Sequence, residues 1–293
     1  MHLPYMELHE AATLQEAVTA KRRYAPDARL LAGGTDLLVD LKAGRVTAGH
    51  LVSVNRIDAL RGVSETDGGL RIGALTTITQ LGRSPIVRER FSPILDATGK
   101  MAAPQIRNVA TVGGNIACAV PCADLPPILT AMHASVALWS PKGERSVPLE
   151  AFFVDARQTV LRDDEVLTRV LMPKPRPGFG AAYARFALRN GNAIAVAAVA
   201  AGLTLGRDNT VRNARIVLGA VAPIPKMVEA ARTVLVGRRP EEEAFRAAAL
   251  LAVEAAEPIS DVRGSADFRR EVVGVMTRRA LATACRRARE NAA

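Results

Sequence analysis

Two glycine pairs occur in similar local sequences, since each is followed directly by a polar residue. Gly33-Gly34 precedes Thr35, and Gly113-Gly114 precedes Asn115. A glycine pair can adopt positive φ angles and expose successive N–H groups, and such backbone nests bind anions, most often phosphate oxygens. Thr35 and Asn115 can add side-chain hydrogen bonds. Two loops of this kind could hold a pyrophosphate from both sides, although each pair is also compatible with a simple tight turn. Neither loop matches the Rossmann fingerprint or the P-loop pattern.

The cysteines and histidines form no recognisable catalytic or metal site in the sequence. Cys118 and Cys122 follow the second glycine pair, and Cys285 lies far away. An iron–sulfur cluster held by cysteine needs four thiolates, so we expect inert, packed thiols. The histidines are scattered without metal-ligand spacing, at His2, His9, His50 and His133. No pattern indicates an activated serine or cysteine nucleophile.

The chain has 293 residues, of which 49% are hydrophobic and 23% are charged. This length and composition fit one large or two ordinary globular domains and exclude intrinsic disorder as the main state. No apolar run is long enough to span a bilayer, and the N-terminal residues lack the pattern of a secretory signal. With three cysteines a disulfide framework is not expected, and we predict a cytoplasmic protein with reduced thiols.

The formal net charge is +10, and most of the basic residues are arginine. Such a surplus is compatible with nucleic acid, an acidic partner subunit or an anionic ligand. Aromatic residues make up only 4% of the chain and are not interleaved with basic residues, whereas proteins that stack bases combine the two. We therefore do not expect nucleic acid to be a partner.

Short alternating elements must position the two glycine pairs. A helix over 14–24 with Thr13 as its N-cap precedes a strand at 28–31, which ends in the first glycine loop. Further strands are expected at 50–54, 70–75 and 164–173, and a hairpin at 134–149. Further helices are expected at 76–84, 93–102 and 123–132, the last with Asp124 near its start and proline in its first turn.

Residues 172–180 contain three prolines and two glycines and cannot lie inside a regular element, so we expect a domain boundary there. Beyond it, apolar runs predict three consecutive strands, at 183–188, 194–205 and 211–221. The alanine-rich second run is also compatible with a helix. Three helices follow, at 226–237, 240–256 and 265–290. The predicted fold class is α/β (α+β).

Five segments occur in an order and spacing that resemble a known family: RLLAGGTDLLVDLK, LRIGALTTITQL, PQIRNVATVGGNIA, DLPPILTAM and GSADFRREVVGVMTRRAL. The chain resembles the FAD-binding (medium) subunits of molybdenum hydroxylases, the family of the carbon monoxide dehydrogenase medium subunit and the xanthine dehydrogenase flavin domain. The resemblance covers nearly the whole chain. It implies a PCMH-type FAD-binding domain at 1–176 and a smaller C-terminal domain at 177–293, built from a three-stranded antiparallel sheet and helices.

The resemblance also implies a non-covalent FAD site. The loop from Leu30 to Leu37 would wrap the pyrophosphate, and the loop from Thr111 to Asn115 would close on it. Asp124 would bind the polar linker of the cofactor, and Arg185 would place a cation near the flavin unless it only forms a surface salt bridge. The implied cofactor-binding residues are Leu31, Ala32, Gly33, Gly34, Thr35, Asp36, Leu37, Met101, Thr111, Val112, Gly113, Gly114, Asn115, Asp124, Leu167 and Arg185.

By the same resemblance, the chain would transfer electrons and would itself contain no catalytic residue and no metal. A large molybdopterin subunit would oxidise the substrate, and a small subunit with two [2Fe–2S] clusters would relay single electrons. The flavin subunit would pass them in pairs to an external acceptor, and a dimer of heterotrimers is implied. Two alternatives stay open: a self-sufficient flavin oxidase of the same broad fold, with a covalently held flavin, and a basic non-catalytic interaction protein.

Overall fold

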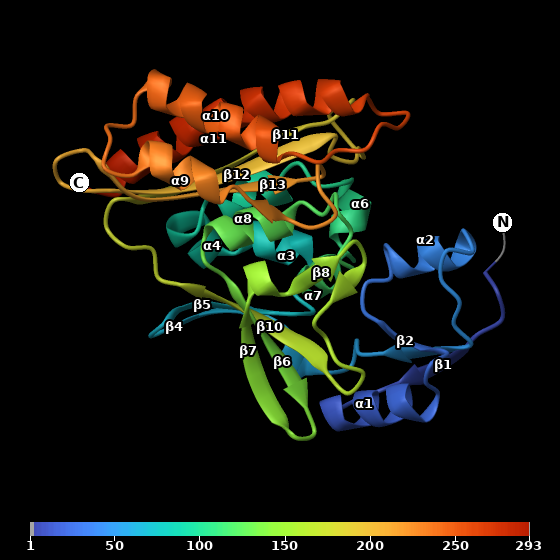
Figure 1. Cartoon of the computed structure of the whole chain (residues 1–293). Coiled ribbons are helices and arrows are strands. Elements are labelled where there is room, and N and C mark those ends of the chain that lie inside the picture. The colour runs from blue at the N-terminus through green and yellow to red at the C-terminus, as the bar shows by residue number, and fades with distance from the viewer. Residues whose placement is uncertain (1–2, 293) are drawn as a thin grey trace.

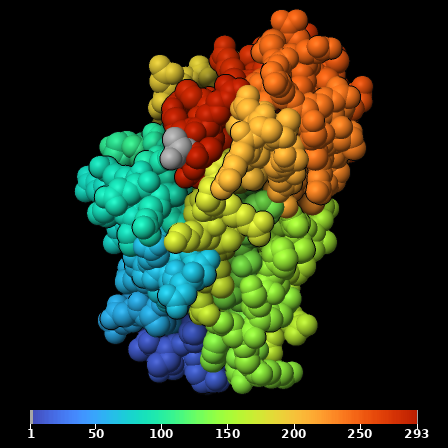
Figure 2. Space-filling view, turned by 90° about the vertical axis from the view of Figure 1, so that its left-hand side faces the viewer, coloured from blue at the N-terminus to red at the C-terminus, as the bar shows by residue number. Residues whose placement is uncertain are grey.

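Residues 3–292, which the computed structural model describes, form a mixed α/β fold with three principal sheets. A four-stranded sheet covered by helices lies at one end of the molecule, and a small parallel sheet lies near the other (Figure 1). A side view shows the same order, with the C-terminal helices in orange and red above the N-terminal segment in blue (Figure 2). A five-stranded antiparallel sheet lies between them along the chain.

The small sheet is parallel and has the strand order β1-β3-β2. It contains β1 (Glu7–Glu10), β2 (Ala28–Leu31) and β3 (His50–Ser53), which are linked by α1 (Leu14–Arg23) and α2 (Leu37–Lys42). The Thr13 side chain accepts a hydrogen bond from the Glu16 N–H, which confirms the predicted N-cap of α1. The first glycine loop therefore lies between the end of β2 and the start of α2.

The five-stranded sheet has the order β4-β5-β10-β6-β7, and all its pairs are antiparallel. Its strands are β4 (Val63–Thr66), β5 (Gly69–Gly73), β6 (Ser135–Ser140), β7 (Gly143–Pro148) and β10 (Val166–Pro173). The predicted hairpin is confirmed as the β6–β7 pair. Short elements accompany this sheet: η1 (Asp58–Leu60), η2 (Leu149–Ala151), β8 (Phe153–Asp155) and β9 (Gln158–Thr159).

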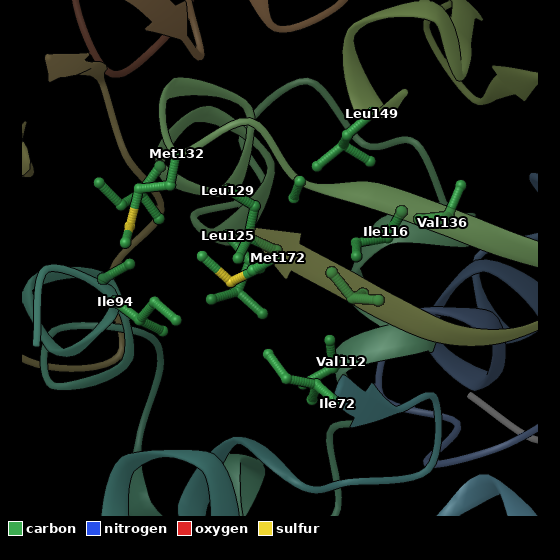
Figure 3. Packing of buried hydrophobic residues seen from close by; sticks show 14 of the residues in the cluster. Ile72, Ile94, Val112, Ile116, Leu125, Leu129, Met132, Val136, Leu149 and Met172 are labelled. Atoms are coloured by element: carbon green, nitrogen blue, oxygen red, sulfur yellow. The ribbon is translucent and has the colours of Figure 1, made fainter. Parts of the chain in front are cut away.

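A series of short helices connects β5 to β6 and carries the second glycine pair. They are α3 (Ile78–Arg83), α4 (Pro85–Arg90), α5 (Ile94–Thr98), α6 (Pro104–Arg107), α7 (Val112–Ala117) and α8 (Leu125–Ala131). Apolar side chains such as Val112, Ile116 and Leu125 pack against Ile72 and Met172 of the sheet (Figure 3). This buried contact fixes α7 and the start of α8 in place, and Asp124 directly precedes α8.

The C-terminal sheet is antiparallel and has the order β11-β12-β13-β14. The three predicted strands are β11 (Phe179–Phe186), β12 (Ala197–Leu205) and β13 (Val211–Gly219), followed by the two-residue β14 (Lys226–Met227). The predicted three-stranded sheet thus has a short fourth strand. The helix predicted from residue 226 begins later, as α9 (Glu229–Leu235), because Lys226 and Met227 pair with β13.

The two remaining helices are α10 (Glu242–Ala255) and α11 (Ala266–Glu290). Together with α9 they cover one face of the C-terminal sheet, whereas α8 packs on the other face (Figure 1). Ala198 and Ala200 of β12 belong to the core shared with α8, and Val199 and Leu203 belong to the core beneath α9–α11. Burial on both faces explains why β12 is apolar at every position except Thr204, which is only partly buried. Within residues 3–292, no helix has the length and hydrophobicity needed to cross a membrane.

Replacing Arg287 with methionine should lower the free energy of unfolding by about 2 kcal/mol. The reason is that its guanidinium forms charge-assisted hydrogen bonds that join α11 to α5 and β11. Arg287 of α11 donates to both carboxylate oxygens of Asp96 on α5, at 2.6 and 3.0 Å, and to the Ala181 carbonyl at 2.8 Å. Urea unfolding would measure the change. Arg286→Met is the matched control on the same helix, because Arg286 is exposed and should contribute under about 0.5 kcal/mol. Equal losses in the two variants would contradict the prediction.

Candidate functional site

A cavity of about 960 Å³ opens where the parallel sheet meets α7 and the segment before α8. This volume lies at the upper end of the range for small-molecule and cofactor sites. Most of the predicted cofactor residues line it: Ala32, Gly33, Gly34, Thr35, Asp36, Leu37, Met101, Thr111, Gly113, Gly114, Asn115, Asp124 and Leu167. The chain therefore brings residues from both glycine loops to one surface.

Three of the predicted residues lie behind the cavity wall. Leu31 packs in a small apolar cluster with neighbours from α2. Val112 is fully buried in the core beneath the five-stranded sheet. Arg185 lies behind Asp124 and is not among the described residues that line the cavity. These side chains can support the site, but direct contact with a ligand in the cavity is not expected of them.

The first glycine loop offers free backbone donors to the cavity. Among the hydrogen bonds of residues 3–292, none uses the N–H groups of the segment from Gly33 to Asp36 as donors. Gly34 has a φ angle of +73°, so the chain turns through the left-handed region that glycine tolerates best. Consecutive free N–H groups around such a turn form an anion-binding concavity. The predicted nest therefore has the required geometry at this loop.

The second glycine loop does not expose its N–H groups, so the nest predicted there is wrong. The N–H groups of Val112 and Gly113 donate to the carbonyls of Thr76 and Ala74 at 2.9 and 2.8 Å, and the Gly114 N–H donates to Thr111 Oγ1 at 3.1 Å. Gly113 is instead required by close packing, since a Cβ there would lie 2.6 Å from that of Ala74. Thr111 acts as the N-cap of α7.

The polar contribution of the second loop comes from the Asn115 side chain. Its Oδ1 atom is buried yet forms no hydrogen bond within the described part of the chain. Asn115 lines the same cavity as the free N–H groups of the first loop. A buried amide without a partner is unfavourable in an isolated protein. The cavity therefore fits a ligand that supplies polar atoms at both loops.

Asp124 is held in the cavity wall by two side chains of β11. Its carboxylate accepts hydrogen bonds from Tyr183 Oη at 2.7 Å and from Arg185 Nη1 at 3.3 Å. Burial raises the pKa of Asp124, while Arg185 and Tyr183 act to lower it. The Arg185 side chain is only 4% exposed, so it does not form the surface salt bridge considered above. It also donates to the carbonyls of Lys100 and Ala193, and thus joins three segments of the wall.

Asp36 of the first loop was predicted as a cofactor residue, but the charged residues around it were not. Asp36 lies beside Asp40, which is bound by Arg157 and by Arg45, the latter at 2.9 Å. Burial raises the pKa of Asp36, and the neighbouring Asp40 raises it further. The raised pKa means that these surroundings disfavour the charged form of Asp36. Residues 40 and 157 are far apart in sequence, so no local pattern indicates their pairing.

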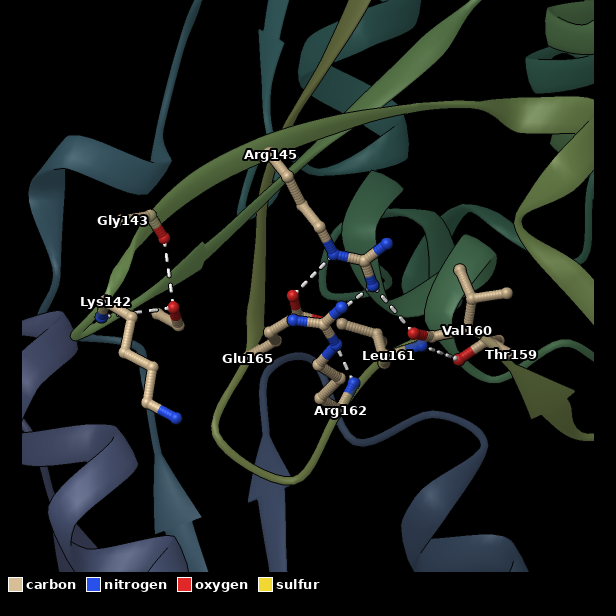
Figure 4. Close-up of polar contacts among 9 residues, drawn as sticks. Lys142, Gly143, Arg145, Thr159, Val160, Leu161, Arg162 and Glu165 are labelled. Carbon is tan, nitrogen blue, oxygen red and sulfur yellow. Dashed lines mark hydrogen bonds and ion pairs between the residues drawn. The ribbon is translucent and has the colours of Figure 1, made fainter.

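The opposite wall is braced by an ion pair between Arg145 of β7 and Glu165 (Figure 4). The guanidinium donates to both carboxylate oxygens, at 2.6 and 2.8 Å, and to the Val160 carbonyl at 2.8 Å. Hydrogen bonding from Arg145 lowers the pKa of Glu165 despite its burial. The pair fixes the segment from Leu161 to Leu167, which lines the cavity.

Cys118 and Cys122 both line the cavity, whereas Cys285 is buried in α11. Burial raises the pKa of the Cys118 thiol to about 12 and also raises that of Cys122. The thiolate is the nucleophilic form of cysteine. Both cavity thiols are therefore neutral near pH 7 and unsuited to attack a bound cofactor.

In the native protein without cofactor, alkylation of Cys118 at about pH 9 should be slower than that of a free thiol by roughly several hundredfold, because so little thiolate is present. Timed iodoacetamide labelling followed by peptide mass spectrometry would measure the rate. The urea-unfolded chain is the control, and there all three cysteines should react alike. Rapid labelling of Cys118 in the folded chain would contradict this expectation.

Comparison with known proteins agrees with the cavity chemistry. The family described as FAD binding domain in molybdopterin dehydrogenase matches residues 4–175, and the CO dehydrogenase flavoprotein C-terminal domain matches residues 181–284. The carbon monoxide dehydrogenase medium chain of Hydrogenophaga pseudoflava is 37% identical, with 95% of this chain and 96% of that protein covered. The putative xanthine dehydrogenase FAD-binding subunit of Escherichia coli is 32% identical, with 96% of each covered.

Solved structures show the same similarity. Carbon monoxide dehydrogenase from Hydrogenophaga pseudoflava, in a form that lacks the Mo-pyranopterin moiety, superposes with a TM-score of 0.94 at 37% identity over 98% of this chain and 99% of that one. Quinoline 2-oxidoreductase from Pseudomonas putida gives a TM-score of 0.91 at 31% identity over the full length of both chains. The chain therefore belongs to the family of FAD-binding medium subunits of molybdenum hydroxylases, which are oxidoreductase subunits.

Proposed function

We propose that this chain binds one FAD non-covalently and transfers electrons within a larger molybdenum hydroxylase. Electrons would arrive from the [2Fe–2S] clusters of a small subunit and leave to an external acceptor, while a large molybdopterin subunit oxidises the substrate. Similar proteins are named as the medium chain of carbon monoxide dehydrogenase and as a subunit of a 6-hydroxypseudooxynicotine dehydrogenase complex. These names support an assembly with further subunits, which we propose to be a dimer of heterotrimers.

The observation that carries the FAD proposal is the run of free N–H groups from Gly33 to Asp36, in the same cavity as the unpartnered amide oxygen of Asn115. We assign the pyrophosphate to the first loop and a further polar contact to Asn115. Asp124 would orient the polar linker, and Met101 and Leu167 would give the flavin an apolar environment. When bound, FAD supplies the exchange between one-electron and two-electron transfer. The residues of this chain bind it, orient it and exclude water.

The first test is the amount and attachment of flavin in the purified chain. After denaturation, the released flavin is chromatographed and compared with the protein. Near-stoichiometric, freely released FAD supports the proposal. No FAD after incubation with excess cofactor, in the chain alone and in its complex with the partner subunits, would overturn the FAD site.

The second test addresses electron transfer. The FAD-loaded chain is mixed anaerobically with the reduced small [2Fe–2S] subunit of the proposed complex, and the visible flavin absorbance is followed. Bleaching that requires the small subunit supports the proposed role, and no bleaching in the assembled complex contradicts it. Direct reduction by an organic substrate without partners would favour the oxidase alternative. Among the described residues that line the cavity there is no histidine, and its two thiols are neutral, so covalent attachment is not supported.

A further inference from the structure

Three side chains with metal-ligand chemistry meet on the small parallel sheet, outside the FAD cavity. Glu7 and His9 are two residues apart on β1, so their side chains lie on the same face of the sheet. His50 is the register partner of Glu7 on the neighbouring strand β3. The two histidines are 41 positions apart, which is why their spacing in the sequence indicated no metal site.

The ligand atoms have separations that suit a single small cation. His9 Nε2 and His50 Nδ1 are 3.1 Å apart, and Glu7 Oε2 lies 3.8 Å from the first and 3.5 Å from the second. Metal–ligand distances near 2.0–2.2 Å place neighbouring atoms of a tetrahedral zinc site roughly 3.3 Å apart. The observed triangle is therefore close to three corners of such a site.

Packing holds the two imidazole rings in this arrangement. Tyr24 stacks on the His9 ring at a centroid distance of 4.5 Å and on the His50 ring at 4.0 Å. The histidine side chains are 27% and 23% exposed, and that of Glu7 is 54% exposed. The site is thus supported on its protein side and open on the other, where solvent can occupy a fourth position.

We propose that Glu7, His9 and His50 form a binding site for one divalent transition-metal ion of the zinc class. Two imidazoles and one carboxylate suit zinc and its neighbours, whereas calcium and magnesium prefer oxygen ligands alone. The bound ion links β1 to β3 and so stabilises the sheet from which the first glycine loop extends. The competing arrangement is a metal-free histidine–histidine hydrogen bond beside a carboxylate.

Titration of the chelator-treated full chain with Co²⁺ tests the proposal, because tetrahedral cobalt gives visible absorption bands. We expect one equivalent to bind and Zn²⁺ to displace it. His9→Phe and His50→Phe keep a ring that can stack on Tyr24 but lack the ligand nitrogen, and each should weaken binding by more than about 100-fold. Glu7→Gln should weaken it by at least about tenfold.

Two matched variants provide controls. Glu10→Gln alters the other glutamate of β1, and His133→Asn removes a distant histidine whose positive φ asparagine tolerates. Both should bind Co²⁺ as the unaltered chain does. Zn²⁺ should also raise the melting temperature of the unaltered chain but not of either phenylalanine variant. Absence of cobalt binding, or binding that survives both phenylalanine substitutions, would overturn the site in favour of the metal-free hydrogen bond.

Discussion

The Gly33→Ala variant should lose FAD affinity by roughly tenfold to hundredfold. A Cβ at residue 33 would overlap the Val109 carbonyl and lie 3.2 Å from the Ala110 Cα. These are backbone atoms and cannot move as easily as the end of a flexible side chain. Such overpacking typically destabilises by 1–3 kcal/mol, or about one to two orders of magnitude in an equilibrium constant. The loop must move away from residues 109–110, which redirects its free N–H groups.

Fluorescence titration of the flavin-free variant with FAD measures this loss. Gly68→Ala is the control, because its added Cβ would meet only the Thr66 hydroxyl, at 4.0 Å, and Gly68 does not line the cavity. The control should bind FAD with unchanged affinity. If Gly33→Ala bound FAD as tightly as the unaltered chain, the close approach of the two loops would be irrelevant to the cofactor.

Arg185→Met should lower the free energy of unfolding by about 3 kcal/mol and also weaken FAD binding. The substitution leaves the buried Asp124 carboxylate without its cation and removes the bonds to the Lys100 and Ala193 carbonyls. Removing one partner of a buried ion pair commonly destabilises by about 3–5 kcal/mol. Urea unfolding measures the change, with the exposed Arg246→Met as a control expected to lose under about 0.5 kcal/mol.

The Arg185→Met effect should depend on pH. Burial already raises the pKa of Asp124, and Arg185 opposes that rise, so its removal raises the pKa further. Because a protonated carboxyl requires no cation, the loss of stability should be smaller at about pH 5 than at about pH 8. The double variant Arg185→Met/Asp124→Asn should recover part of the loss. A shifted flavin potential with unchanged stability would instead indicate that Arg185 acts on the flavin directly.

The sequence predicted the location of the two cofactor loops better than the role of their backbone N–H groups. Both glycine pairs line one cavity, as the similar sequences around them indicated. Only the first forms a nest, because the N–H groups of the second are taken by Ala74, Thr76 and Thr111. A Gly-Gly pair thus supports anion binding in the first loop and close packing in the second. Local sequence cannot distinguish these roles, since the competing acceptors come from other segments.

The features that could not be predicted depend on contacts between distant residues. The helix–strand ambiguity at 194–205 resolves as β12 because α8 lies on one face and α9–α11 lie on the other. The sequence left open whether Arg185 lies near the flavin or forms a surface salt bridge, and in the structure its buried guanidinium binds Asp124 and two backbone carbonyls. His9 and His50 meet only because β1 and β3 are paired. Each outcome is decided by tertiary packing. The periodicity and spacing of residues along the sequence do not reveal which distant segments pack together.

The two-sided burial of β12 has a consequence for synthesis of the protein. When the ribosome has released only residues 1–176, α8 has been made, but Ala198 and Ala200, which complete its core, have not. The nascent chain therefore exposes an apolar surface until β11–β13 emerge and close over it. Completion of the cofactor-binding half must wait for the C-terminal half, so a truncated translation product would be a substrate for chaperones and proteases rather than a small flavoprotein.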